Sequence, residues 1–247
     1  MSKIILFFTV LIALISCHSR FENKTIKTKD VLSIHDKLND YFKDFRLKSA
    51  IEIKNTESNQ TEIQLSSHKI EWIDSENETK IQIDNDLFSL KDKATLNIVW
   101  DKIDSVDFVN NWDVIKLFKY NNRELIGIRM SFQPCTGLGC SVDYFLIYDV
   151  LTKTKNFFGT FHTDNDLDLF DFHNDDKLDY VSKTFNGDAQ GSTSMDFIYE
   201  LYSLDSSGQF SEQKNKNGLT YYLKYTTFPN DSALSDKFEQ DWITKIK

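Results

Sequence analysis

Hydrophobic residues follow two different periods along the chain. Between residues 30 and 45 they recur every three or four positions, at Val31, Ile34, Leu38, Tyr41, Phe42 and Phe45. This spacing predicts a helix that opens at Asp30 and buries one stripe. From residue 47 the period changes to two, which is typical of strands with one buried face. A second helix is predicted from Ser232, and its buried side would carry Leu234, Phe238, Trp242 and Ile246.

The alternating segments predict a mainly β protein. Short strands are expected at residues 50–53, 61–65, 69–73, 80–83, 95–100 and 114–118. Segments richer in aromatic residues follow at 124–132, 143–149, 156–161, 178–185, 195–204 and 219–228. The first two of these would form a hairpin, and Asp205 to Gly208 would be a hairpin turn. We expect antiparallel sheets, arranged as a sandwich or part of a propeller, with a helix near each end of the mature chain.

The first seventeen residues have a different pattern. Lys3 precedes an apolar run from Ile4 to Ile15, and Ser16 precedes Cys17. This is the order of a secretory signal peptide, and the run is too short for a membrane span, which needs about 20 apolar residues. The residues Leu14 to Cys17 resemble the lipobox of bacterial lipoproteins. The resemblance implies cleavage before Cys17, a covalent lipid on its sulfur and acylation of the new N-terminus, for instance with palmitate.

The resemblance also implies a location in the cell. The residue after Cys17 is His18 and not Asp. By analogy with lipoproteins of two-membrane bacteria, this favours the outer membrane and leaves open whether the chain faces the periplasm or the surface. A single-membrane bacterium also stays open. We expect a signal peptide over residues 1–16, a lipidated Cys17 with a polar tether over 17–29, and one mostly-β domain over 30–247.

Composition refines this picture. The chain is 40% hydrophobic and 14% aromatic, enough for a substantial core. All eight glycines lie at or after Gly127, a hint of two subdomains that meet near residue 110. The formal net charge of −9 argues against nucleic-acid binding, which relies on basic side chains that neutralise phosphates. The expected partners are the membrane, through the anchor, and a protein or glycan of the envelope.

Two cysteines remain after Cys17 is assigned to lipid. They are Cys135 and Cys140, in the loop between two predicted strands. Outside the cytoplasm such a pair is expected to form a disulfide, which would stabilise the loop by ~2 kcal/mol. A zinc site would need further Cys or His ligands, and the redox motif has a shorter C-x-x-C spacing.

Aspartate is concentrated between His162 and Tyr180, at Asp164, Asp166, Asp168, Asp171, Asp175, Asp176 and Asp179. Like charges repel unless they are solvated or share a cation. The segment from Asp171 to Asp179 resembles the calcium loop of FG-GAP and VCBS-type repeats, D-x-[DN]-x-[DN]-G-x-x-D. The resemblance implies carboxylate ligands from Asp171, Asp175 and Asp179 and a carbonyl ligand from Lys177. His173 departs from the pattern at the third place, where Asp or Asn is expected, and Asp176 replaces the turn glycine.

These residues admit other interpretations. The loop can be a solvated acidic turn without an ion. His162, Asp164 and His173 could instead gather a transition metal, and paired aspartates could hydrolyse a glycoside. A sugar platform could use the tryptophans, although single tryptophans in strands usually pack in the core, and these are Trp72, Trp100, Trp112 and Trp242.

The function that the sequence favours is a lipid-anchored binding or structural module of the envelope, with a structural calcium loop, rather than an enzyme. Two alternatives stay open. One is a metal-dependent hydrolase that uses the Asp-rich loop. The other is an inhibitor or protective protein that binds another protein. A pocket with converging acids would favour the hydrolase, and an exposed apolar patch would favour the protein binder.

Overall fold

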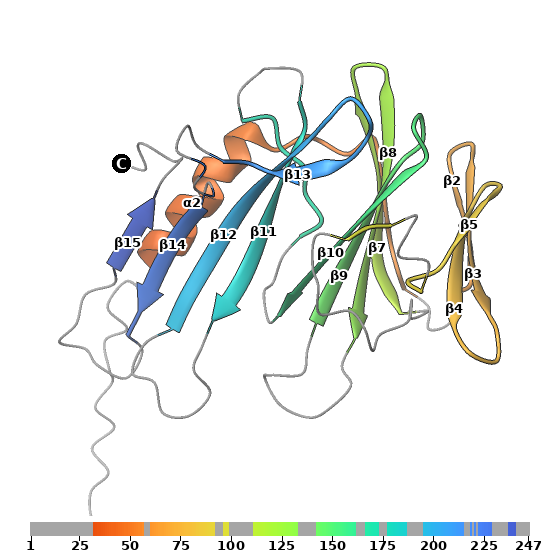
Figure 1. Ribbon diagram of the computed structural model, residues 1–247, viewed down its shortest axis with the longest axis horizontal. Helices are drawn as coiled ribbons and strands as arrows, with labels where there is room; N and C mark the ends of the chain where they lie inside the picture. Colours follow the sequence, from red (N-terminus) through yellow and green to blue (C-terminus); the bar gives the residue numbers. More distant parts are fainter. Residues whose placement is uncertain are drawn as a thin grey trace, which may run out of the picture. The chain divides into compact units, whose positions relative to one another are not determined.

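The computed structural model describes residues 32–56, 60–91, 96–98, 111–132, 142–161, 166–172, 177–186, 195–214, 218, 220, 222–228 and 237–240. By its internal contacts the chain divides into residues 1–36 and residues 37–247. Of the first unit, only the start of helix α2 (Leu32–Phe45) is described. The second unit holds the rest of α2 and the strands β1 to β15 (Figure 1).

Three sheets make up the second unit. The central sheet has the order β1 (Ile51–Lys54), β7 (Trp112–Tyr120), β8 (Arg123–Phe132), β9 (Val142–Asp149), β10 (Thr154–Phe161) and β6 (Leu96–Ile98). The small sheet has the order β2 (Glu62–Leu65), β3 (His68–Asp74), β4 (Thr79–Ile83) and β5 (Asp86–Phe88). The C-terminal sheet has the order β11 (Asp179–Asn186), β12 (Met195–Leu204), β14 (Tyr222–Thr227) and β15 (Lys237–Gln240), with β13 (Phe210–Glu212) also paired to β12.

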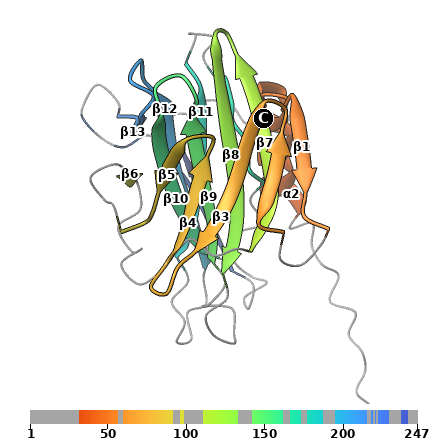
Figure 2. The ribbon, with the colours of Figure 1, turned by 90° about the vertical axis from the view of Figure 1, so that its right-hand side faces the viewer.

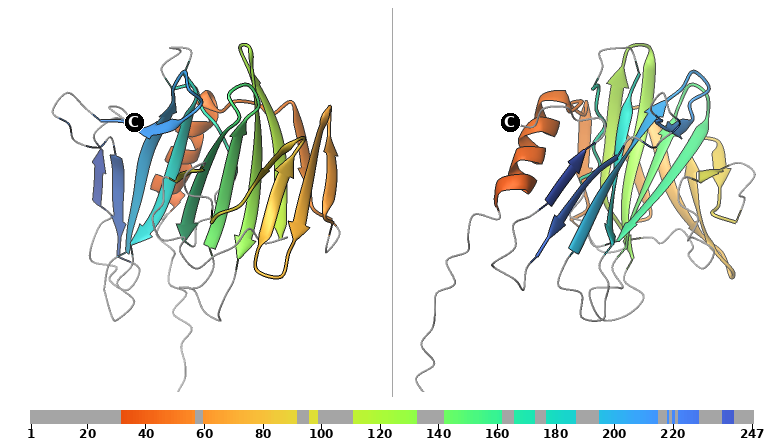
Figure 3. Two further views of the ribbon diagram at one scale, coloured as in Figure 1. Left: turned by 45° about the vertical axis from the view of Figure 1, so that its right-hand side comes forward. Right: turned by 60° about the vertical axis from the view of Figure 1, so that its left-hand side comes forward.

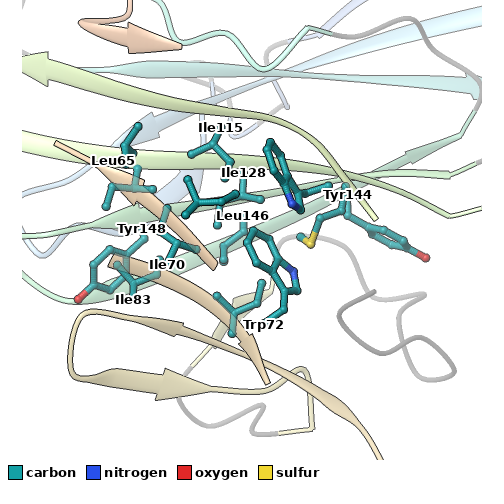
Figure 4. Close-up of a cluster of buried hydrophobic side chains, with 14 of the residues drawn as sticks. Leu65, Ile70, Trp72, Ile83, Ile115, Ile128, Tyr144, Leu146 and Tyr148 are labelled. Atoms are coloured by element: carbon teal, nitrogen blue, oxygen red, sulfur yellow. The ribbon is translucent and has the colours of Figure 1, made fainter. Parts of the chain in front are cut away.

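The small sheet covers one face of the central sheet (Figure 2). Alternation along β8 places Ile126, Ile128 and Met130 on this face. Each strand of the small sheet contributes buried side chains, which are Ile63, Leu65, Ile70, Trp72, Ile81, Ile83 and Phe88. Figure 4 shows Leu65, Ile70, Trp72 and Ile83 beside Ile115, Ile128 and Leu146 of the central sheet. The wet face predicted for these short strands is therefore the outer face of the small sheet, where Leu87 is exposed.

The opposite face of the central sheet is also apolar. Leu125, Phe145 and Phe158 point to this side and pack against residues 167–169 and the first strands of the C-terminal sheet. Strand β11 lies alongside β10 (Figure 3). The ring centroids of Phe158 and Tyr180 are 4.0 Å apart. The central sheet is therefore buried on both faces.

One glycine makes this second contact close. A Cβ atom at Gly127 would lie 2.7 Å from Cδ2 of Leu167. The missing side chain lets the segment that contains Leu167 sit directly on β8.

From Lys37 onward, helix α2 packs on the C-terminal sheet through Phe42, a residue of the predicted stripe. Leu38 and Phe42 are buried. The ring centroid of Phe42 lies 6.0 Å from that of Tyr199 on β12 and 5.5 Å from that of Phe170. The part of α2 that belongs to the second unit thus adds an aromatic layer to one face of the sheet.

The predicted mainly β, antiparallel fold is confirmed, but three details differ. Phe238 lies in strand β15, opposite Tyr225, and not in the predicted C-terminal helix. Pairing with β14 satisfies the backbone groups of Lys237–Gln240. Strand β6 runs parallel to β10 and not antiparallel. Strands β5 and β13 escaped prediction because three residues are too few to establish a period.

A buried ion pair joins the central sheet to the segment before β11. Lys116 Nζ lies 3.2 Å from Asp168 Oδ1, and Arg46 Nε lies 3.0 Å from Asp168 Oδ2. The side chains of Lys116 and Asp168 are only 11% and 10% exposed. Glu52 of β1 approaches Lys116 at 3.6 Å. Because both members are withdrawn from water, each needs the other to offset its desolvation.

Replacing Asp168 with alanine should therefore lower the free energy of unfolding by about 3 kcal/mol, since it leaves Lys116 buried with only the more distant Glu52. Urea unfolding of the full chain would measure the change. The matched control is Glu62→Ala, which removes an exposed ion pair with Lys69 and should cost no more than about 0.5 kcal/mol. Equal losses in the two variants would contradict this role of Asp168.

Candidate functional site

A backbone bridge between Phe170 and Asp179 joins the two ends of the predicted calcium loop. The amide of Phe170 donates to the carbonyl of Asp179 at 2.9 Å, and the amide of Asp179 donates back at 2.8 Å. The amide of Asp171 donates to the carbonyl of Phe45 at the end of α2. The first and ninth places of the motif are thus held at one end of a closed loop.

Both described carboxylates of the motif accept hydrogen bonds. The hydroxyl of Tyr120 donates to Asp171 Oδ2 at 2.7 Å. Asp179 is 1% exposed, and it accepts from the hydroxyl of Ser203 and, at 3.1 Å, from the amide of Phe172. A carboxylate has about four lone-pair positions, so these bonds fix its orientation without using all of its capacity. The arrangement shapes the loop and is compatible with a hard cation.

The remaining site residues are distributed as follows. Lys177 is exposed, whereas His173 and Asp175 lie outside the described residues. Within the described part of the chain, no three His, Cys, Asp or Glu side chains gather as metal ligands. Calcium binding therefore stays a prediction. Also outside the described residues are His162, Asp164, Cys17, Cys135 and Cys140.

Two of the tryptophans are core residues. The rings of Trp72 and Trp112 stack between the small and central sheets, with their centroids 6.0 Å apart. The two residues are 4% and 1% exposed. The indole nitrogen of Trp112 donates to the carbonyl of Gln60, which ties the approach to β2 to the central sheet. Buried rings of this kind cannot form an open sugar platform. Trp100 and Trp242 lie outside the described residues.

A second acidic group escaped prediction. Ser131 of β8 forms hydrogen bonds with both Asp113 of β7 and Asp143 of β9, the latter at 2.9 Å. Arg129 Nη2 lies 3.3 Å from Asp143, while its buried Nε has no hydrogen-bond partner. The signal in the sequence was the phase of Asp143, which shares one face of its strand with the buried Phe145 and Ile147. The other members come from different strands, so no spacing could have indicated the group.

In this group one hydroxyl lies between two carboxyl groups. Ser131 has one hydroxyl hydrogen and can donate it to only one of the two carboxyl groups. Burial raises the pKa of Asp143, against the opposing charge of Arg129 and the hydrogen bond of Ser131. A protonated Asp143 would donate to Ser131, which could then donate to Asp113.

Comparison of the chain with protein-family models, with curated proteins and with solved structures finds no match in any of the three. In the part of the chain that the structure describes, no helix is both long enough and apolar enough to cross a membrane.

The raised pKa of Asp143 gives a pH dependence with a definite sign. A raised pKa of Asp143 contributes stability that is present below its ordinary value of 3.8 and is lost as pH rises through the folded-state pKa. Asparagine resembles the protonated acid. The unfolding free energy of the wild-type chain minus that of Asp143→Asn should therefore fall as pH rises above the ordinary value of 3.8.

Urea unfolding at several pH values would measure this difference. Asp40→Asn, on an exposed position of α2, is the matched control for the loss of a surface carboxyl. A difference that rises with pH would show that Asp143 is instead held as a carboxylate.

Proposed function

We propose that this protein is a lipid-anchored module of a bacterial cell envelope, with a binding or structural role and no catalytic one. The observation that carries the proposal is the segment Lys3 to Cys17, with its charge, its short apolar run and its lipobox-like end. Several acyl chains on the new N-terminus would give stable anchoring, whereas one chain binds only marginally. Residues 18–29 would then hold the folded part away from the membrane.

The use of charge inside the β unit supports a module rather than a hydrolase. Asp149 is fully buried and accepts from Arg123 at 2.5 Å and from the amides of Leu151 and Thr152. Arg123 also donates to the carbonyl of Ser206, in the turn between β12 and β13. The buried carboxylate of Asp149 thus holds Arg123 in the position from which Arg123 joins the central sheet to the turn between β12 and β13. Lys116 and Asp168 are engaged in the same way, so these buried charges serve architecture.

The calcium loop fits this proposal as a structural element. An ion bound by Asp171, Asp175, Asp179 and the Lys177 carbonyl would fix the entry to β11, whose first residue is Asp179. The bonds from Tyr120 and Ser203 already orient two of these carboxylates, which favours binding by reducing the ordering cost. A Cys135–Cys140 disulfide would restrain the loop between β8 and β9 in the same structural sense.

Lipidation is tested by mass spectrometry of the full chain expressed in a bacterium. We expect a mature N-terminal peptide that begins at Cys17 and carries acyl chains, and a protein that sediments with membranes. The Cys17→Ser variant should lose both properties, because the sulfur is the attachment point. The matched control, Cys135→Ser, should keep them. A wild-type chain that begins with an unmodified Cys17, or at another residue, would overturn the proposal.

Calcium binding is tested by the melting temperature of the full chain in detergent, with millimolar Ca²⁺ or with a chelator. A ligand that binds only the folded state stabilises it by ~2.7 kcal/mol at one hundred times its dissociation constant, so melting should shift upward. Asp171→Asn should reduce the shift, while Asp166→Asn, in the same acidic segment but outside the motif, should preserve it. The calcium loop would be refuted by a melting temperature that Ca²⁺ leaves unchanged.

A further inference from the structure

A buried histidine links the small sheet to the central sheet. His68, the first residue of β3, is 7% exposed. Its Nδ1 lies 2.8 Å from Asp84 Oδ2, in the turn between β4 and β5, and its Nε2 lies 3.2 Å from Glu124 Oε2 on β8. The ring therefore bridges carboxyl groups of two different sheets.

The protonation state of the ring follows from a count of hydrogens. A neutral imidazole has one N–H and could donate to only one of the two carboxylates. Its other nitrogen would then present a lone pair to the second carboxylate. The imidazolium has two N–H groups and satisfies both partners, so the observed geometry is that of the protonated ring.

We propose that His68 is a proton-dependent clamp that holds the small sheet on the central sheet and releases it when the ring loses its proton. Closing the clamp covers the apolar face formed by Ile126, Ile128 and Met130. Opening it would expose part of that face. The clamp rests on the described contacts alone and does not depend on the lipid anchor or on calcium.

The charged groups around the ring support this assignment. Glu124 also binds Lys119 Nζ of β7 at 2.7 Å, and Asp84 accepts from the amide of Lys69 at 2.9 Å. The hydrogen bonds from Lys119 and then from His68 lower the pKa of Glu124. Burial alone would raise the pKa of Asp84, but the hydrogen bonds from His68 and from the Lys69 amide lower it. Both partners therefore stay ionised at neutral pH.

A third carboxylate lies nearby but has its own partners. Asp86 of β5 accepts from Tyr148 of β9 at 3.3 Å and pairs with Lys155 of β10 at 3.2 Å. Burial raises the pKa of Tyr148, so its hydroxyl stays protonated throughout the range in which histidine titrates. The contacts of Asp86 should keep the β5 side of the small sheet attached when the His68 side opens.

The sign of the pH effect is fixed by the shift at His68. Burial lowers its pKa, but the hydrogen bonds and charges of Asp84 and Glu124 outweigh burial and raise it. A raised pKa gives stability that is fully present below the ordinary value of about 6.5. This stability is lost as pH rises through the folded-state pKa. The small sheet should thus be held tightly in mild acid and less tightly in mild base.

Two measurements on the full chain in detergent test the clamp. Nuclear magnetic resonance should find that His68 titrates above about 6.5, and that Glu124→Gln lowers its pKa because one carboxylate is removed. Hydrogen exchange, corrected for its intrinsic pH dependence, should show β3 and β4 opening about threefold or more as pH rises from 5.5 to 8.5.

His68→Gln should abolish the pH dependence of opening in β3 and β4, because glutamine stays neutral throughout. His35→Gln, in α2, is the matched control and should preserve it. If His68→Gln does not fold, the titration of the wild-type ring still decides. A ring that titrates at or below about 6.5, or an exchange rate in β3 and β4 that pH leaves unchanged, would overturn the proposal.

Discussion

The central sheet is apolar on both faces, and this constraint determines the rest of the fold. Along β8, Ile126 and Ile128 face the small sheet, whereas Leu125 faces residues 167–169 and the C-terminal sheet. A sheet of this kind cannot be stable in water until both faces are covered. The chain supplies one cover before the central strands, through residues 62–88, and one after them, through residues 166–212.

Polar groups specify how the small sheet and residues 166–212 are positioned on the central sheet. Hydrophobic contact alone would tolerate a shift of either cover, because apolar contact has little directionality. The bonds from His68 to Glu124, from Lys116 to Asp168 and from Arg123 to Ser206 each allow one register. Such bonds add little net stability, because the buried pair of Lys116 and Asp168 loses much of its gain to desolvation and the bond to Ser206 is exposed. We infer that their main contribution here is to select a single arrangement of layers.

Much of the fold could be predicted because the buried faces leave a period in the sequence. Ile63 and Leu65, or Ile81 and Ile83, alternate with polar neighbours and reveal their strands directly. A C-terminal helix was predicted because the spacing of Leu234, Phe238 and Trp242 fits a helical stripe, and it is wrong over Lys237–Gln240, which form strand β15. Pairing of Lys237–Gln240 with β14 outweighs that local pattern. The residues of so short a segment do not by themselves distinguish a helix from a strand.

The sites were less predictable than the strands. The motif from Asp171 to Asp179 was visible because its residues are neighbours in the sequence. The partners of its carboxylates, Tyr120 and Ser203, come from β7 and β12 and could not be anticipated. His68 lies 56 residues from Glu124, so their contact depends on how two sheets meet. Local patterns indicate elements, whereas such groups arise only from tertiary packing.

The late arrival of the second cover has a consequence for biogenesis. The strands β7 to β10 are complete at Phe161, but Leu167, Tyr180 and Phe210, which shield one of their faces, come later in the chain. Synthesis proceeds from the N-terminus, so the face that carries Phe145 and Phe158 stays uncovered until these later residues have been made. Contacts between residues so distant in sequence form slowly, and an open apolar face invites aggregation. The chain should therefore depend on protection by a chaperone until about residue 210 has emerged.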